Sequence, residues 1–430
     1  MDWIQAFGWQ WLHALAQLFL QPFYYVGILF IVLQYRRQVA LERRLFSTKL
    51  HGLLSETWRT VLWGWLGGLG ASVLMAGVGA TISPDAVILL WLLSLLLMLV
   101  RVRYLCWAYA VGAIGVLQAI AGILPGFRTS ESWRWLAEPL LSLQMPALLA
   151  LVAILHLAEA VFVRMQGARF GMPLFVETKR GKIVGGYRLQ GFWPMTLFLL
   201  VPLQQAGGGP ALPWTPLLGG EAWLNGWTII GFPVMIGFSE MTISRLPQLK
   251  ARASSGLLFL YAAAVLGLAA LSAWLPFFTI PACLLAIGLH EGMIWYSRWD
   301  ESRRVPIFTQ DRKGLKILAI LPGSPAEELG LKAGEIVAKV NGAPVRNKQE
   351  LHQAFQLNPA FCRLEILDDA GEKRLLKRGI FAGEHHQLGI VLVPDHEVMY
   401  YLEERPDSIW AYLSRRLVGL LRNEKRSRSV

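Results

Sequence analysis

Charged residues are scarce in this chain: they make up 16% of its 430 residues, against about 25% in an ordinary soluble domain. Cysteine is scarcer still, since Cys106, Cys283 and Cys362 are the only ones, and their wide spacing matches neither a disulfide framework nor a metal-ligand motif. No basic segment precedes the first apolar run, so a cleaved signal peptide is not expected. These shortages argue against an ordinary soluble protein and predict no metal site and no cofactor.

Apolar runs fill the first 297 residues, whereas charge is concentrated in residues 298–430, and 54% of the whole chain is hydrophobic. The pattern predicts a multi-domain protein with an α-helical polytopic membrane bundle at 16–297, preceded by an interfacial amphipathic segment at 1–15 and followed by a linker at 298–306. The net charge of +12 lies largely in short loops beside apolar runs, as the positive-inside rule predicts. Nucleic acid is therefore not an expected partner.

The apolar runs predict eight or nine membrane spans, since a span needs about 20 apolar residues. Arginine and lysine in alternate loops place the carboxy-terminal domain in the cytoplasm. Glycines at 64, 67, 68 and 70 are interpreted as a face on which helices pack closely. The expected spans are 16–33, 61–82, 87–100, 105–124, 140–163, 223–243, 257–274 and 277–296, with 193–201 a short candidate for the ninth.

Three apolar segments share a glutamate a few residues before an arginine near their cytoplasmic ends. The glutamates are Glu159, Glu240 and Glu291. Ionisable groups at membrane depth mark functional sites, so these residues are candidates for an intramembrane acidic cluster, which a transporter would use. The alternative is that each glutamate pairs with a neighbouring cation at the membrane interface.

Residues 322–342, PGSPAEELGLKAGEIVAKVNG, carry the most specific pattern in the chain. Pro325 stands where a helix tolerates proline, at its first position, and Gly330 is suited to end that helix in a left-handed conformation. Asn341-Gly342 is a strong hairpin signal. The run resembles the PDZ domain of bacterial membrane-associated proteins, and a small α+β PDZ domain is predicted at 307–396.

The PDZ resemblance implies a peptide-binding groove. Such domains bind a peptide as an added strand between a sheet edge and a helix, and amides of a short apolar-Gly-apolar loop hold the terminal carboxylate. Leu388-Gly389-Ile390 is the only good candidate for this loop, although it follows the other strands instead of preceding them. In a permuted domain it would lie beside a helix at 348–356, with His352 and Phe355 lining the groove. Otherwise this segment is a plain closing strand.

The tail at 397–430 alternates apolar and basic residues near helical spacing. It predicts a basic amphipathic helix that contacts an anionic membrane surface. The contact residues would be Trp410, Arg415, Arg416 and Arg422. The alternative is a helix packed on the PDZ domain.

Because PDZ domains often accompany proteases, the proteolytic chemistries need separate consideration. A zinc protease of the membrane type needs two histidines one helical turn apart, but His290-Glu291-Gly292-Met293 is followed by Ile294 in the second ligand position. His290 is therefore expected at the membrane interface. Ser239 with His290 is the remaining pairing for an intramembrane serine protease. The sequence favours a protein that is not an enzyme.

The whole arrangement resembles the MinJ family of Gram-positive rods. The resemblance is also carried by YRRQVALERRLFSTKLH at 35–51, SEMTISRLPQLKA at 239–251 and GEHHQLGIVLVPD at 383–395. It implies a scaffold for division-site selection in the bacterial cell membrane, with a cytoplasmic PDZ domain and enrichment at the septum or poles. The implied partners are the lipid bilayer and division proteins like DivIVA and MinD.

Overall fold

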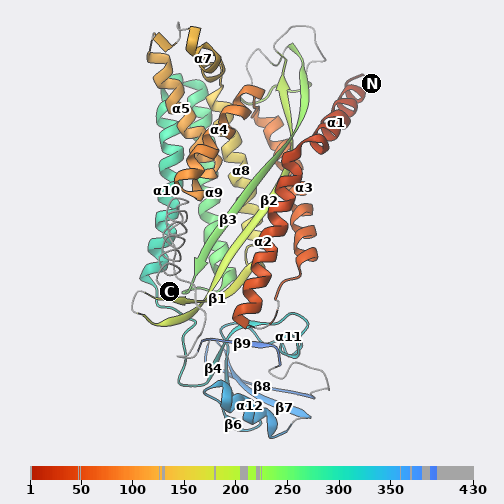
Figure 1. The fold of residues 1–430 in the computed structure, drawn as a ribbon, viewed down its shortest axis with the longest axis vertical. Helices are drawn as coiled ribbons and strands as arrows, with labels where there is room; N and C mark the ends of the chain where they lie inside the picture. Colours follow the sequence, from red (N-terminus) through yellow and green to blue (C-terminus); the bar gives the residue numbers. More distant parts are fainter. Residues whose placement is uncertain are drawn as a thin grey trace, which may run out of the picture.

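The computed structural model describes residues 2–46, 48, 50–124, 126–127, 131–178, 181–203, 212–218, 223, 225–358, 360–368, 370–379 and 388–394. Figure 1 shows a tall helical part, threaded by a long β-hairpin, with a small sheet-containing domain at one end. The longer helices are α1 (Asp2–Leu20), α2 (Pro22–Phe46), α3 (Leu53–Val78), α4 (Pro84–Val100), α5 (Trp107–Ile123), α7 (Arg134–Leu141), α8 (Met145–Gln166), α9 (Pro247–Trp274) and α10 (Thr279–Arg303).

Four helical segments of the described chain are long and apolar enough to cross a membrane: α3, α8, α9 and the run that ends with α10. A fifth is possible if α1 and α2, which meet at a bend of 57°, count as one span. The prediction of eight or nine spans is therefore wrong. Two of the expected spans, now α4 and α5, are shorter helices, and two more are not helical at all.

The expected crossings at 193–201 and 223–243 are the two strands of one hairpin. Strand β2 (Ile183–Pro202) pairs antiparallel with β3 (Trp227–Thr242), from Tyr187 opposite Thr242 to Pro202 opposite Trp227. Strand β1 (Gly171–Glu177) covers the other edge of β2 only as far as Leu189. Apolar runs of this length do not distinguish a buried strand from a helix by hydropathy, which explains the error.

Helical side chains satisfy backbone groups on the free edges of this hairpin. The Phe198 amide donates to Ser72 Oγ at 2.8 Å, and the Gln21 side-chain amide donates to the Gly231 carbonyl at 2.7 Å. Gln10 both donates to and accepts from the β3 backbone. In an apolar surrounding an unpaired backbone group costs several kcal/mol, so these bonds make an open sheet edge tolerable inside the bundle.

Two glycines let α3 lie directly against β2. A side chain at Gly64 would overlap the Pro194 carbonyl, and one at Gly68 would overlap the backbone of Thr196. The predicted close-packing face of α3 is thus present, but its partner at these positions is a strand instead of a helix. A side chain at Gly70 would meet no atom within 4 Å, so this glycine lies outside the contact.

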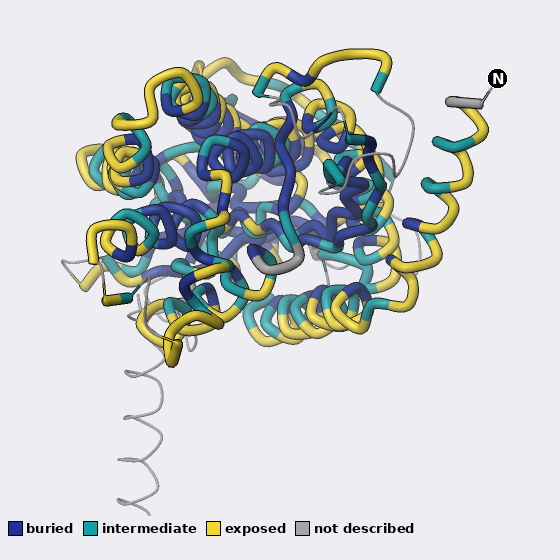
Figure 2. Tube along the Cα trace, turned by 90° about the horizontal axis from the view of Figure 1, so that it is seen from above, coloured by how far each residue is buried: buried dark blue, intermediate teal, exposed yellow. Residues whose placement is uncertain are grey.

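The first helix differs from the expected short interfacial segment. It continues to Leu20, and its residues Ala14 and Leu18 are buried against Trp227 and Ile229 of β3. Figure 2 shows that exposed residues lie along outward helix faces and buried ones between the helices. Several exposed positions carry large apolar side chains, for example Leu66, Leu92 and Leu260. An apolar outer surface of this kind is consistent with a membrane protein.

The small domain confirms the predicted α+β chain order. It contains β4 (Leu315–Ile320), α11 (Pro325–Glu328), β5 (Ile336–Val340), β6 (Ala343–Pro344), α12 (Lys348–Gln356), β7 (Phe361–Leu367), β8 (Lys373–Gly379) and β9 (Ile390–Leu392). The sheet order is β8-β7-β5-β4-β9, with β6 paired to β5. The turn chemistry is as expected: Pro325 begins α11, Gly330 has φ +69°, and Asn341 and Gly342 both have positive φ.

One face of this sheet packs on the end of the hairpin. Leu318 of β4 and Val391 of β9 belong to the same buried cluster as Phe175 and Tyr187 of β1 and β2. The Tyr187 hydroxyl donates to the Leu318 carbonyl, and further backbone bonds join residues 185 and 243 to residues 308 and 307. Most of the expected linker is helical, because α10 continues to Arg303. The small domain is therefore fixed against the bundle by direct packing.

Candidate functional site

Strand β9 forms one end of the small sheet. Among the described residues its only partner strand is β4, with Ile390 opposite Ile320 and Leu392 opposite Ile317. An edge strand presents unpaired backbone groups on its outer side, which an extended peptide can use. The segment identified from the sequence is thus the end strand of the sheet, but its residues Leu388 to Val393 are all buried, so use of this edge by a peptide stays a prediction.

The loop before β9 has a defined left-handed backbone. Leu388 has φ 54° and Gly389 has φ 79°. Their carbonyls accept hydrogen bonds from the Ala326 and Leu321 amides, each at 2.9 Å, which holds the loop against the start of α11. A side chain at Gly389 would overlap Ser324, so glycine is required there by space as well as by φ. The two carbonyls are therefore used within the fold, and binding of a carboxylate by the loop amides stays a prediction.

Helix α12 contributes to the same core as β9. Leu351, Ala354 and Phe355 are buried in one cluster with Leu388 and Ile390. Phe355 is 7% exposed and is a core residue, whereas exposed His352 accepts a hydrogen bond from the Gln356 side chain at 3.0 Å. Peptide binding by these residues stays a prediction. The expected membrane-contact residues Trp410, Arg415, Arg416 and Arg422 lie outside the described residues.

Two of the three glutamates pair with cations of other elements. Glu291 lies 2.8 Å from Arg103 and accepts a hydrogen bond from Tyr109 at 2.9 Å. Glu240 lies 3.1 Å from Lys250. Glu159 interacts electrostatically with Glu240, but no ion pair with a cation is recorded for it among the described residues. The pairing of Glu240 and Glu291 favours the structural interpretation of these two residues.

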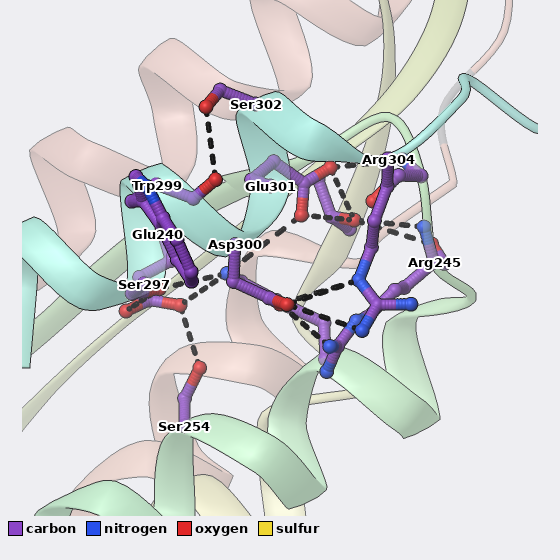
Figure 3. A network of polar contacts seen from close by, with 12 residues as sticks. Glu240, Arg245, Ser254, Ser297, Trp299, Asp300, Glu301, Ser302 and Arg304 are labelled. Atoms are coloured by element: carbon purple, nitrogen blue, oxygen red, sulfur yellow. Dashed lines mark hydrogen bonds and ion pairs between the residues drawn. The ribbon is translucent and has the colours of Figure 1, made fainter.

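Lys250 is the centre of a polar network, of which Figure 3 shows Glu240, Ser297 and Glu301. Its side chain is 4% exposed and lies between Glu240, at 3.1 Å, and Glu301, at 3.9 Å. Ser254 and Ser297 donate further hydrogen bonds to the Glu240 carboxylate. A buried charge is stable only when it is paired and hydrogen-bonded, and here strand β3 and helices α9 and α10 each supply part of that environment.

The same network fixes the point where the chain leaves the bundle for the small domain. The Glu301 carboxylate accepts hydrogen bonds from the Ile243 and Ser244 amides at 2.8 and 2.9 Å. Asp300 pairs with Arg245 and with Arg304, which follows α10 (Figure 3). The end of α10 is therefore bound to the turn after β3, and this contact sets the starting direction of the small domain.

A second polar cluster was missed by the sequence analysis. Cys106, His156 and His290 bring one ligand atom each to within 4.8 Å of one another. His156 and His290 lie 50 and 184 positions after Cys106 in the sequence, so no motif spacing could indicate the cluster. His290 is buried and contacts Cys106 and Tyr109, whereas its expected place at the membrane interface stays a prediction.

Comparisons with known proteins agree with the fold of the small domain. A family model described as "PDZ domain" matches residues 316–367. The chain is 29% identical over 407 residues to the cell division topological determinant MinJ of Bacillus subtilis (strain 168), which covers 90% of this chain and 96% of that protein. It is also 29% identical over 303 residues to a probable MinJ of Lacticaseibacillus paracasei, covering 66% of this chain and 77% of the relative. No solved structure matches the chain.

Proposed function

Because this chain is MinJ-like over nearly its whole length and carries a PDZ domain, we propose that it is a membrane-anchored scaffold for division-site selection. The observation that supports this most directly is the PDZ sheet packed on the end of the helical bundle through Leu318, Val391 and Tyr187. A domain held in this way has a fixed position relative to the membrane. Its output is contact with other proteins, without catalysis.

The β9 edge and the Leu388-Gly389 loop are the proposed contact surface for partners. A peptide would extend the sheet beyond β9 and place its carboxylate at the loop amides. Attachment to the membrane raises the effective concentration of the domain near membrane-bound partners, so a weak interaction suffices. By the MinJ resemblance, the partners would be division proteins like DivIVA and MinD, and the PDZ domain would face the cytoplasm at the septum or poles.

The arrangement of Ser239 and His290 does not support the serine-protease alternative. Ser239 is an exposed residue of β3. The ring nitrogens of His290 face Cys106 and Tyr109. A serine protease needs its histidine to contact the nucleophile. The ion pairs of Glu240 and Glu291 likewise leave the transporter alternative without two of its proposed free carboxylates.

Fluorescent fusions in a Gram-positive rod test the proposal. The full chain is expected to concentrate at septa or poles, whereas a chain without residues 307–430 stays in the membrane but spreads evenly and leaves division misplaced. The shortened chain keeps the Lys250 network at the end of α10, although it loses the packing of Leu318 and Val391 on the hairpin. An even distribution of the full chain, with normal division when its gene is deleted, would contradict the proposal.

A pair of glycine variants separates the proposed edge from the rest of the domain. Gly389→Ala places a methyl group on Ser324 and should abolish septal localisation. Gly371→Ala is the control, because φ is +82° at Gly371 and +79° at Gly389, so alanine is equally unfavourable at both positions. A side chain at position 371 meets no atom within 4 Å, so this variant should localise normally. Normal septal localisation of both variants would show that the loop before β9 has no role in localisation.

A further inference from the structure

Cys106, His156 and His290 come from three different elements of the bundle. Cys106 is the residue directly before α5, His156 lies within α8 and His290 lies within α10. The Cys106 Sγ atom is 3.3 Å from His156 Nε2 and 3.7 Å from His290 Nε2. Both histidine side chains are almost fully buried. Three ligand-type atoms therefore meet at one point, where both histidines are buried and Cys106 is half-buried.

These distances fit the edges of a metal coordination tetrahedron. With Zn–S of about 2.3 Å and Zn–N of about 2.0–2.1 Å, tetrahedral geometry gives S···N of about 3.6 Å and N···N of about 3.3 Å. The two observed S···N distances lie within about 0.3 Å of that value, and the three atoms lie within 4.8 Å of one another. The two S···N distances are therefore close to those of a tetrahedral zinc site.

In both histidines a hydrogen bond at Nδ1 orients the ring so that the Nε2 lone pair faces Cys106 Sγ. His156 Nδ1 donates to the Val152 carbonyl at 2.8 Å, because a carbonyl can only accept. The Tyr109 hydroxyl donates to Glu291, which is paired with Arg103, so Tyr109 accepts from His290 Nδ1 at 3.0 Å. Both neutral rings then carry an unprotonated Nε2. Metal-binding histidines are oriented by this kind of second hydrogen bond.

Without a bound ion, hydrogen bonds within the cluster cannot satisfy all of its polar atoms. The Cys106 thiol has one proton, whereas two Nε2 lone pairs face the sulfur. One of the two buried lone pairs therefore lacks a donor within the cluster, and an unsatisfied buried acceptor costs about 1–3 kcal/mol. A single cation bound to the thiolate and both nitrogens satisfies all three atoms at once.

Close helix packing holds the three residues in place. Gly112 and Gly115 of α5 allow the approach of α10, since a side chain at either position would overlap Ile287 or Cys283. The Tyr261 ring lies 4.8 Å from the His156 ring and 5.3 Å from the His290 ring, and its hydroxyl donates to the Ala286 carbonyl. The Tyr261 ring thus packs against both histidine rings.

We propose that Cys106, His156 and His290 bind one divalent transition-metal ion, Zn²⁺ being the best match, with water in the fourth position. One thiolate and two imidazoles suit zinc and offer no oxygen ligand to Mg²⁺ or Ca²⁺. On binding, the Cys106 thiol loses its proton to solvent and sulfur and both nitrogens donate their lone pairs to the ion. The ion links α5, α8 and α10. This site goes beyond the proposed scaffold function and does not depend on it.

Cobalt substitution of the full chain, purified in detergent and stripped with a chelator, tests the site. One equivalent of Co²⁺ should produce a thiolate-to-cobalt charge-transfer band, which Zn²⁺ then removes by displacement. Cys106→Ser should abolish the band. Cys283→Ser, which changes a second free cysteine in the same bundle, should retain it. Absence of the band in the unaltered chain, or equal spectra of the two variants, would overturn the proposal.

A second pair of variants tests the orienting hydrogen bond. Tyr109→Phe removes the partner of His290 Nδ1 and should weaken Zn²⁺ binding roughly 10- to 100-fold. Tyr261→Phe removes a hydroxyl that contacts the Ala286 carbonyl instead, so affinity should be retained. If variants fail to fold, zinc X-ray absorption of the unaltered chain decides the question. One sulfur and two imidazole nitrogens support the site, and a spectrum without sulfur refutes it.

Discussion

Replacing Gly68 with valine is expected to prevent α3 from packing on β2, so that little folded protein is recovered. A side chain at this position would overlap the carbonyl oxygen, amide nitrogen and carbonyl carbon of Thr196. Backbone atoms of a paired strand cannot move aside as a flexible side chain can. Overpacking alone costs about 1–3 kcal/mol. Displacement of α3 also breaks the bond from the Phe198 amide to Ser72, which adds about 1–3 kcal/mol for a buried unpaired donor.

Gly70→Val is the matched control for this prediction. It lies on the same helix two residues later, and a side chain there meets no atom within 4 Å. We expect its yield and melting temperature in detergent to resemble those of the unaltered chain, whereas Gly68→Val should give mostly aggregated material by size-exclusion chromatography. Normal elution and melting of Gly68→Val, or equal damage by both substitutions, would contradict the observed packing of helix on strand.

Lys250→Met is expected to destabilise the chain by about 3–5 kcal/mol, the usual cost of removing one partner of a buried ion pair. The substitution leaves Glu240 and Glu301 near each other with no cation between them. It also removes the hydrogen bond from Lys250 to Ser297 at 2.8 Å. The readout is the melting temperature of the full chain in detergent.

Two further variants establish that the Lys250 effect comes from buried charge. Lys250→Met combined with Glu240→Gln should recover part of the lost stability, because one unpaired carboxylate is removed. Arg304→Met should lower the melting temperature far less, since the Arg304 side chain is 48% exposed and its partner Asp300 keeps Arg245. A Lys250→Met chain as stable as Arg304→Met would show that the network in Figure 3 contributes little.

The small domain was predictable because its signals are local. Pro325, Gly330 and Asn341-Gly342 each determine a turn or helix end within a few residues, and the structure has all of them in place. Local signals could not predict the position of the β9 edge, because its place beside β4 depends on pairing across about seventy residues. Resemblance to other PDZ domains identified the loop, and the sheet order then placed it.

The interior of the bundle was not predictable from hydropathy. The run at 223–243, which contains β3, is as long as a span, and the run at 193–201 in β2 is about half that length. Pro233 and Pro194 within these runs are poor helix residues and argued against helices there. Proline is tolerated there because β1 no longer covers β2 beyond Leu189. The contacts of Lys250 and of Cys106 depend on helices that meet only in the folded chain, so no sequence spacing encodes them.

Site-specific photo-crosslinking in dividing cells tests the central claim that the PDZ edge contacts division proteins. A crosslinking amino acid is placed at exposed His352 on α12, and for comparison at Leu375 on β8, at the opposite end of the sheet. The scaffold account predicts a discrete adduct with a division protein from position 352, absent from position 375 and absent in the Gly389→Ala background. No adduct from position 352, or the same adducts from both positions, would contradict it.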